Sequence, residues 1–109
     1  MKKFIVIYSA NESAMKELMK GTAEDRKNAM GQWMQWAKKC GSGLVDLGSP
    51  LGNGQKVTSS GGMPSPSWVV GYSILQAENM AEAIEMLKEH PHTTFAKGCE
   101  IQVYESMRM

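Results

Sequence analysis

Two titratable side chains in this chain have the chemistry of a general acid and base, His92 and Asp46. A histidine titrates near neutral pH, and a neighbouring carboxylate fixes which ring nitrogen holds the proton. His92 follows Pro91, whose fixed φ sets the direction of the next side chain. His92 and Asp46 are therefore the predicted catalytic residues. The alternative is structural, with His92 hydrogen-bonded to loop backbone and Asp46 capping an amide or facing water.

Aromatic and hydroxyl side chains are expected to form the walls of a ligand site at the same end of the molecule. The predicted ligand-binding residues are Tyr8, Ser9, Trp33, Trp68 and Tyr72. Concave, mostly apolar sites with a few polar groups are the kind that bind small organic molecules. Trp33 and Trp36, three residues apart, could stack on a ligand. We favour the simpler interpretation that they fill the space between a helix and a sheet, because aromatic residues dominate core burial.

The second histidine, His90, is given a structural role. It stands at the end of a predicted helix, directly before Pro91. A cationic side chain is favoured at a helix C-terminus by the macrodipole. His90 is therefore expected to contact the last helical carbonyls and solvent, and its replacement is expected to leave function intact.

The second half of the chain contains two predicted strands. Residues 68–75 are rich in β-branched and aromatic side chains and are bounded by Pro66 and Gln76, which is typical of a half-buried or buried strand. Residues 99–105 follow Gly98 and alternate apolar with polar side chains. Both segments are predicted to lie in one sheet.

A helix is predicted between these strands. Asn79 precedes Glu82 by three residues, the spacing at which asparagine caps a helix and the glutamate reaches back to it. Pro91 ends the run. One apolar face recurs at helical spacing and consists of Met80, Ala83, Ile84 and Leu87.

The first half repeats these element types. Apolar runs and helical periodicity predict a strand over 4–8, helices over 13–20 and 22–40, and a strand over 44–47. The unbroken apolar run of 4–8 favours a central strand. Residues 48–67 form a Gly-, Ser- and Pro-rich loop in which 56–58 could add a short strand. Its glycines lack the Lys-Ser or Lys-Thr that a phosphate-binding loop requires.

The order strand, helix pair, strand, loop, strand, helix, strand predicts an α+β fold, a ferredoxin-like βαββαβ unit with a four-stranded antiparallel sheet and helices on one face. In that topology Tyr8, Asp46, Trp68 and His92 all lie at one end of the sheet. A single domain, residues 1–109, accounts for the whole chain.

Composition narrows the function classes. Twelve basic and eleven acidic side chains, without long runs of one sign, do not suggest binding to nucleic acid or to an anionic membrane. The apolar run after Met1 lasts five residues, too short for a signal core, so the protein is expected to be cytoplasmic. Cys40 and Cys99 are expected to be reduced thiols. No metal site or cofactor motif is predicted.

Four segments resemble the YCII-related family of the dimeric α+β barrel superfamily: KKFIVIY, LVDLGSPLGNG, GYSILQAENMAEAIEMLKEHPH and CEIQVYESM. The resemblance covers nearly the whole chain and implies a ferredoxin-like protomer that dimerises through its sheet and encloses a cleft. The role of this family is mostly unassigned. Some members are proposed to use a histidine on the first long helix with an aspartate at its end, but residues 30–40 here contain neither. Any polar site must be built differently.

Two function hypotheses follow. The first is a homodimer that binds or transforms a small organic molecule in a cleft between sheet and helices. The alternative is a non-catalytic dimerisation or regulatory module in which no cleft remains. Dimerisation is expected in both, because strands that are apolar on both faces leave one sheet face uncovered.

Overall fold

The computed structural model describes residues 1–65 and 68–109. Its centre is a four-stranded antiparallel sheet in the order β2-β5-β1-β6. The strands are β1 (Lys2–Ala10), β2 (Leu44–Asp46), β5 (Val69–Ala77) and β6 (Cys99–Glu105). The predicted α+β class and antiparallel sheet are confirmed, and this strand order is compatible with a ferredoxin-like unit. Pro66 and Ser67, the predicted end of the long loop, lie outside the described residues.

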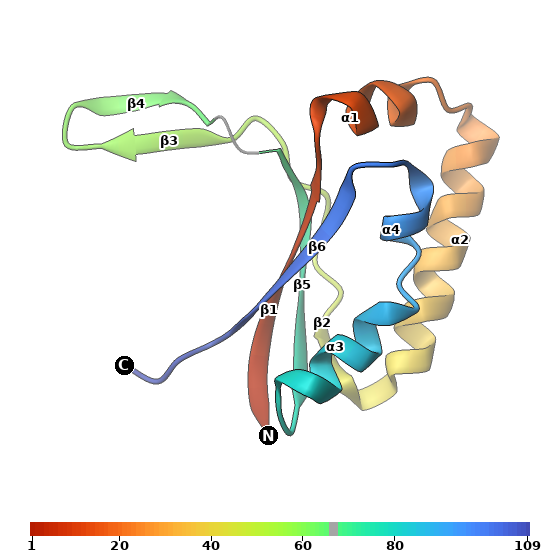
Figure 1. The fold of residues 1–109 in the computed structure, drawn as a ribbon, viewed down its shortest axis with the longest axis vertical. Coiled ribbons are helices and arrows are strands. Elements are labelled where there is room, and N and C mark those ends of the chain that lie inside the picture. The colour runs from red at the N-terminus through yellow and green to blue at the C-terminus, as the bar shows by residue number, and fades with distance from the viewer. Residues whose placement is uncertain (66–67) are drawn as a thin grey trace.

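Helices cover one face of this sheet (Figure 1). They are α1 (Glu12–Met19), α2 (Ala23–Cys40), α3 (Met80–Lys88) and the short α4 (His92–Phe95), with a 3₁₀ turn, η1 (Gly41–Gly43), leading into β2. In the described residues no helix is long and apolar enough to cross a membrane.

Side-chain caps begin α2 and α3 at the predicted residues, but in the described part of the chain only Thr22 and Asp25 form the full reciprocal pair, and the Glu82 side chain does not reach back to Asn79. The Thr22 hydroxyl accepts from the Asp25 amide at 3.1 Å while the Asp25 carboxylate accepts from the Thr22 amide at 2.9 Å. Asn79 accepts from the Glu82 amide at 2.9 Å. Each bond satisfies an amide that has no partner inside the helix.

The short helix α4 replaces a segment that the sequence predicted as loop. Pro91 begins it with φ −69°, and its carbonyl accepts from both the amide and the hydroxyl of Thr94, at 2.9 and 2.6 Å. A proline needs no amide partner at a helix start, so Pro91 ends one helix and begins the next.

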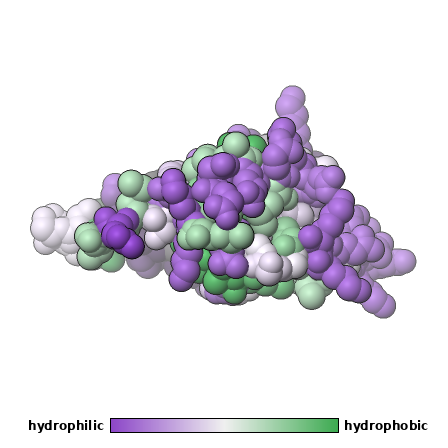
Figure 2. All heavy atoms as spheres, turned by 90° about the horizontal axis from the view of Figure 1, so that it is seen from below, coloured by the Kyte–Doolittle hydropathy of each residue, from purple (hydrophilic) through white to green (hydrophobic). Residues whose placement is uncertain are grey.

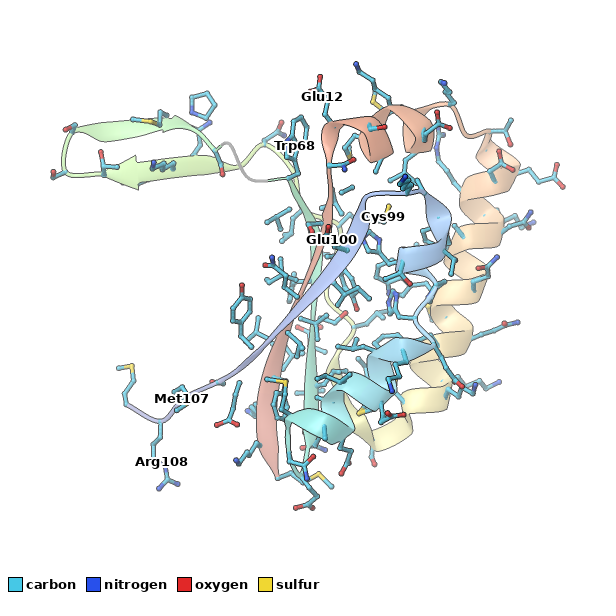
Figure 3. The ribbon with its side chains drawn as sticks, in the orientation of Figure 1. Glu12, Trp68, Cys99, Glu100, Met107 and Arg108 are labelled. Carbon is cyan, nitrogen blue, oxygen red and sulfur yellow. The ribbon has the colours of Figure 1, made fainter. Side chains whose placement is uncertain are left out.

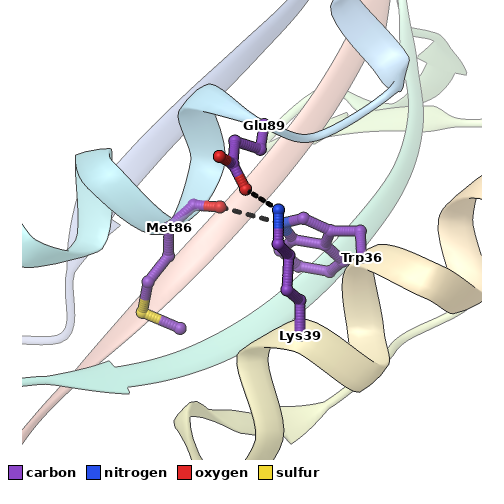
Figure 4. Close-up of polar contacts among 4 residues, drawn as sticks. All are labelled: Trp36, Lys39, Met86 and Glu89. Atoms are coloured by element: carbon purple, nitrogen blue, oxygen red, sulfur yellow. Dashed lines mark hydrogen bonds and ion pairs between the residues drawn. The ribbon is translucent and has the colours of Figure 1, made fainter.

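The core lies between the sheet and the helices. Phe4, Val6, Tyr8 and Leu75 are completely buried. Trp36 closes this core from α2, and its indole Nε1 donates to the carbonyl of Met86 at 2.8 Å (Figure 4). At the surface beside it, Lys39 and Glu89 form an ion pair (Figure 4). Hydrophilic side chains cover the outer side of the helices (Figure 2).

None of the helices in residues 1–65 and 68–109 lies on the opposite face of the sheet, and we call it the open face (Figure 1). On β1, alternate residues are fully buried on the helix side and half-buried on the open face, where Ile5 and Ile7 lie. Tyr72 and Ile74 are their half-buried neighbours on β5, and Tyr104 on β6 is 55% exposed. The open face is therefore apolar at its centre and only partly covered.

A second, two-stranded sheet projects from the body. It consists of β3 (Gln55–Thr58) and β4 (Gly61–Pro64), and it extends to the side of the sheet away from the helices (Figure 1). The sequence predicted only a short strand at residues 56–58. Gly61 has φ +117°, which a side-chain-bearing residue rarely adopts, so this glycine permits the tight turn. Val57 is 79% exposed.

Candidate functional site

A cavity of about 270 Å³ lies between the helices and the part of the sheet where β5 begins, and we call it the inner cavity. Three helices and two backbone segments enclose it. Its walls are Leu18 of α1, Met30 and Trp33 of α2, His92 and Phe95 of α4, residues 47–50 after β2, and residues 70–72 of β5. This arrangement is concave and mainly apolar, with His92 among its few polar groups.

A close approach of backbone to backbone forms one wall of the inner cavity. Gly48 has φ +80°, and a Cβ at this position would lie 1.8 Å from the carbonyl oxygen of Tyr72. The amide of Gly48 donates to Asp46 Oδ1 at 2.8 Å. Asp46 therefore holds the turn that presses residues 47–50 against β5.

His92 lies in the cavity wall with its ring fixed by backbone. It is 3% exposed, and its Nε2 lies 2.8 Å from the carbonyl oxygen of Ser9. Because a carbonyl only accepts, Nε2 carries the proton. Burial lowers the pKa of His92, while backbone hydrogen bonds with Ser9 and Glu100 act in the opposite direction. The ring ties α4 to the end of β1.

His90 is buried, so the expectation that it contacts solvent is wrong. It is 1% exposed, and its Nδ1 accepts from the His92 amide at 3.0 Å. Its ring centroid lies 4.2 Å from that of Trp33, 4.3 Å from that of Trp36 and 4.7 Å from that of Tyr8. The chain turns inward at the end of α3, and the three aromatic rings cover the imidazole.

This burial has an electrostatic consequence for His90. Desolvation, followed by the nearby His92, lowers the pKa of His90 to about 3. The ring is therefore neutral at pH 7 and carries its proton on Nε2, because Nδ1 is an acceptor. Within residues 1–65 and 68–109, that buried Nε2 has no hydrogen-bond partner. The neutral imidazole of His90 therefore packs against the surrounding aromatic rings as another ring would.

Tyr8 lies behind the cavity wall. Its hydroxyl donates to Ser73 Oγ at 2.8 Å, and Ser73 donates to the carbonyl of Leu47 at 2.7 Å. Burial raises the pKa of Tyr8 to about 12. Its ring meets Trp33 edge-on at 4.7 Å between centroids. Tyr8 thus supports Trp33 and, through Ser73, the wall at Leu47, and is completely buried.

Two of the predicted ligand-binding residues, Ser9 and Trp68, line a separate hollow of about 290 Å³, the outer hollow. Trp68 is 50% exposed and lies near the base of the projecting hairpin, and Glu100 of β6 contributes a charge to the same hollow (Figure 3). Trp33 and His92, in contrast, line the inner cavity, and so does Tyr72. The predicted ligand-binding set is therefore divided between two places.

His92 and Asp46 do not meet in this structure. Asp46 is exposed, with Oδ1 accepting from Gly48 and Oδ2 accepting from the Tyr72 hydroxyl at 3.4 Å. No hydrogen bond or ion pair joins it to His92 in the described part of the chain. His92 and Asp46 each hydrogen bond to backbone, which is the kind of contact expected if their roles are structural. Their proposed catalytic role stays a prediction.

The cysteines lie at opposite ends of the sheet region. Cys40 ends α2 and Cys99 begins β6, and both are free thiols. Burial raises the pKa of Cys40 to about 11 and also raises that of Cys99. Thiols with raised pKa are poor nucleophiles and poor metal ligands. Among the described residues no group of three or more His, Cys, Asp or Glu could hold a metal ion.

Sequence reasoning missed Leu18, Met30 and Phe95 as cavity residues. Leu18 and Met30 belong to apolar helical faces, which a sequence assigns to the core without distinguishing a filled core from a cavity, whereas Phe95 lies in a segment predicted as loop. Ser73 was also missed, because a serine inside an apolar strand gives no signal of what its hydroxyl contacts. The loop at residues 47–50 did have a signal, since a Gly-Ser-Pro break after a strand marks an irregular backbone.

No protein-family model matches this chain, and neither does any curated protein. The resemblance to the YCII-related family therefore stays a prediction.

Proposed function

We propose that this protein binds a small organic molecule in the inner cavity. The observation that carries the proposal is an apolar cavity of about 270 Å³ between sheet and helices, with a single histidine in its wall. Small-molecule sites are concave, mostly apolar and furnished with a few placed polar groups. The conformation of the loop at residues 47–50, held by Asp46, supports a wall of fixed shape.

A thermal-shift screen of metabolites tests this proposal, because a ligand that binds only the folded state raises the apparent stability. The decisive control is a pair of substitutions on α2. Met30→Trp fills the cavity mouth, whereas Met34→Trp changes a residue one turn away that is similarly exposed, 50% against 56%. Shifts that Met30→Trp abolishes and Met34→Trp preserves place the ligand in the inner cavity. A screen without such hits would contradict the proposal.

Catalysis by His92 and Asp46 is an extension of this proposal. With a ligand in hand, His92→Ala and Asp46→Asn are each expected to weaken binding or turnover about tenfold or more, about 1.4 kcal/mol. The double variant should lose less than the sum if the two residues act as a unit. Wild-type binding by both single variants would leave these residues with structural roles only.

We also propose that the protein is a homodimer assembled through the open face, which would make it a dimeric α+β barrel. The half-buried Ile5, Ile7 and Ile74 support this, because a contiguous apolar patch on a sheet marks an interaction surface. Light scattering at micromolar concentration should give about twice the chain mass of 12.0 kDa. Ile7→Lys should return the monomer. A wild-type monomer would remove this part of the proposal and leave ligand binding untouched.

The second candidate function is a dimerisation or regulatory module without catalysis. One observation favours it, namely that His92 and Asp46 are both hydrogen-bonded to backbone and are not paired with each other. A dimer that gives no cavity-dependent hit in the screen would support this alternative.

A further inference from the structure

We propose that the ligand of the inner cavity is uncharged and largely apolar, of about the size of two fused rings, with one polar group that reaches Ser49. This inference rests on the proposed function and specifies the class of molecule that the cavity accepts. It is carried by the absence of charged side chains from the described lining, by the size of the cavity and by the exposed Ser49 in its wall.

None of the described residues that line the inner cavity has a charged side chain. Of the described residues around the cavity, the one histidine is His92, and its Nε2 is already engaged by the Ser9 carbonyl. A charged ligand group would therefore lose its hydration and gain no side chain of opposite charge, which is strongly unfavourable. Burial also lowers the pKa of His92, so the imidazole does not supply a positive charge at pH 7. The cavity selects against both anions and cations.

The size of the cavity sets the size of the ligand. An apolar cavity of about 150 Å³ holds one benzene ring. The inner cavity, at about 270 Å³, holds roughly one ring more. Trp33 and Phe95 both contribute aromatic surface near His92, with centroids 6.1 and 6.4 Å from its ring and at steep angles to it. Rings set at such angles offer both faces and edges to a flat apolar molecule.

Ser49 determines where the polar group of the proposed ligand would lie. Ser49, Pro50 and Met30 are the exposed residues of the lining, so they mark where the cavity meets solvent. Within residues 1–65 and 68–109, the Ser49 hydroxyl makes no hydrogen bond. The Tyr72 side chain, in contrast, lies on the open face with Ile7, and its hydroxyl donates to Asp46. A ligand with its apolar body inside the cavity and a neutral donor or acceptor beside Ser49 would hydrogen bond to that hydroxyl.

The test uses probes of the same shape that differ in charge. Naphthalene-2-carboxamide and 2-naphthoate share two fused rings, but only the second carries a charge at pH 7. In calorimetric titrations the amide is expected to bind at least about tenfold more tightly than the carboxylate. Benzamide, which keeps the polar group and one ring, should bind more weakly than the two-ring amide. Met30→Trp should abolish binding of the amide, and Met34→Trp should preserve it.

A second pair of variants tests the polar end. Ser49→Ala should weaken binding of the amide by roughly threefold to tenfold, the range expected for one neutral hydrogen bond. Ser42→Ala, an exposed serine outside the cavity lining, should have no effect.

The outcomes separate this inference from the proposed function. Equal or tighter binding of 2-naphthoate overturns the inference, and so does the absence of binding by every probe. If the metabolite screen then yields a charged molecule whose binding Met30→Trp abolishes, the cavity is a binding site and only the ligand class is wrong. If neither probes nor metabolites bind, both proposals fail.

Discussion

The two faces of the central sheet are built from alternate residues of the same strands, yet they differ in how completely they are closed. On the helix side, Phe4, Val6 and Leu75 are fully buried under helices. On the open face, their sequence neighbours Ile5 and Ile74 are only half-buried. The pleat of a strand sends successive side chains to opposite faces, so an unbroken apolar run supplies both. A helix layer closes one face, and the other keeps apolar surface that is only partly covered.

Substitution of two adjacent residues on β5 gives the largest expected contrast between these faces. Leu75→Ala, on the helix side, should lower the free energy of unfolding by about 2–5 kcal/mol, because the buried cavity it leaves cannot collapse fully. Ile74→Ala, on the open face, should cost about 1 kcal/mol in a monomer. Urea denaturation measures both.

The proposed dimer adds an expectation about protein concentration to this pair of measurements. If a second copy covers the open face, the cost of Ile74→Ala rises and depends on protein concentration. Equal costs for both variants at every concentration would contradict the division into a closed face and an open face.

Closure of the helix side also depends on a buried hydrogen bond at Trp36. Trp36→Phe keeps an aromatic ring but leaves the Met86 carbonyl without its donor, and it should cost about 1–3 kcal/mol. Lys39→Ala, which removes the exposed ion pair with Glu89 nearby, should cost no more than about 1 kcal/mol. Thermal unfolding of the two variants side by side provides the measurement, and a larger effect from Lys39→Ala would sink the argument.

A pH dependence should distinguish the helix side as well, because His90 is buried there in neutral form. Its folded pKa is about 3 against an ordinary value of 6.5, so below pH 6.5 the unfolded chain binds a proton that the folded chain does not. The contribution of neutral His90 to the free energy of unfolding is therefore fully present above about pH 6.5 and is lost as the pH falls toward 3. Between pH 6.5 and 5, the expected loss from this group is about 1–2 kcal/mol.

His90→Asn provides the control for this prediction. The asparagine oxygen can accept from the His92 amide as Nδ1 does, but it does not titrate. The variant should be less stable than wild type and should show a flatter slope of unfolding free energy against pH. The pKa of His92 is also lowered, so part of the pH dependence of the unfolding free energy should remain in the variant. An unchanged slope would mean that His90 is not the buried neutral group.

Local sequence rules predicted the elements and their order well. Thr22 with Asp25 and Asn79 with Glu82 marked helix starts because a cap depends on residues three apart and on little else. The apolar run at residues 4–8 predicted a central strand, and β1 lies between β5 and β6. With those elements in that order, few sheet topologies were compatible.

The candidate site was predicted only in part. Trp33 and His92 do line one cavity, and they were selected for residue type and for the end of the sheet on which they lie. Ser9 and Trp68 satisfy the same criteria but lie at the outer hollow. Position along a strand gives the height of a residue in the sheet, whereas the face also depends on local register. The bulge between Tyr8 and Ser9 is such a shift in register.

The sequence by itself determined the caps, the periodicities and therefore the α+β architecture, because these depend on interactions within a few residues. Only the tertiary structure decided that His90 is buried among Tyr8, Trp33 and Trp36, since those rings come from distant segments. It also decided that a cavity remains between α2 and the sheet. Whether apolar faces meet or leave space depends on how whole elements pack, and no local pattern encodes that.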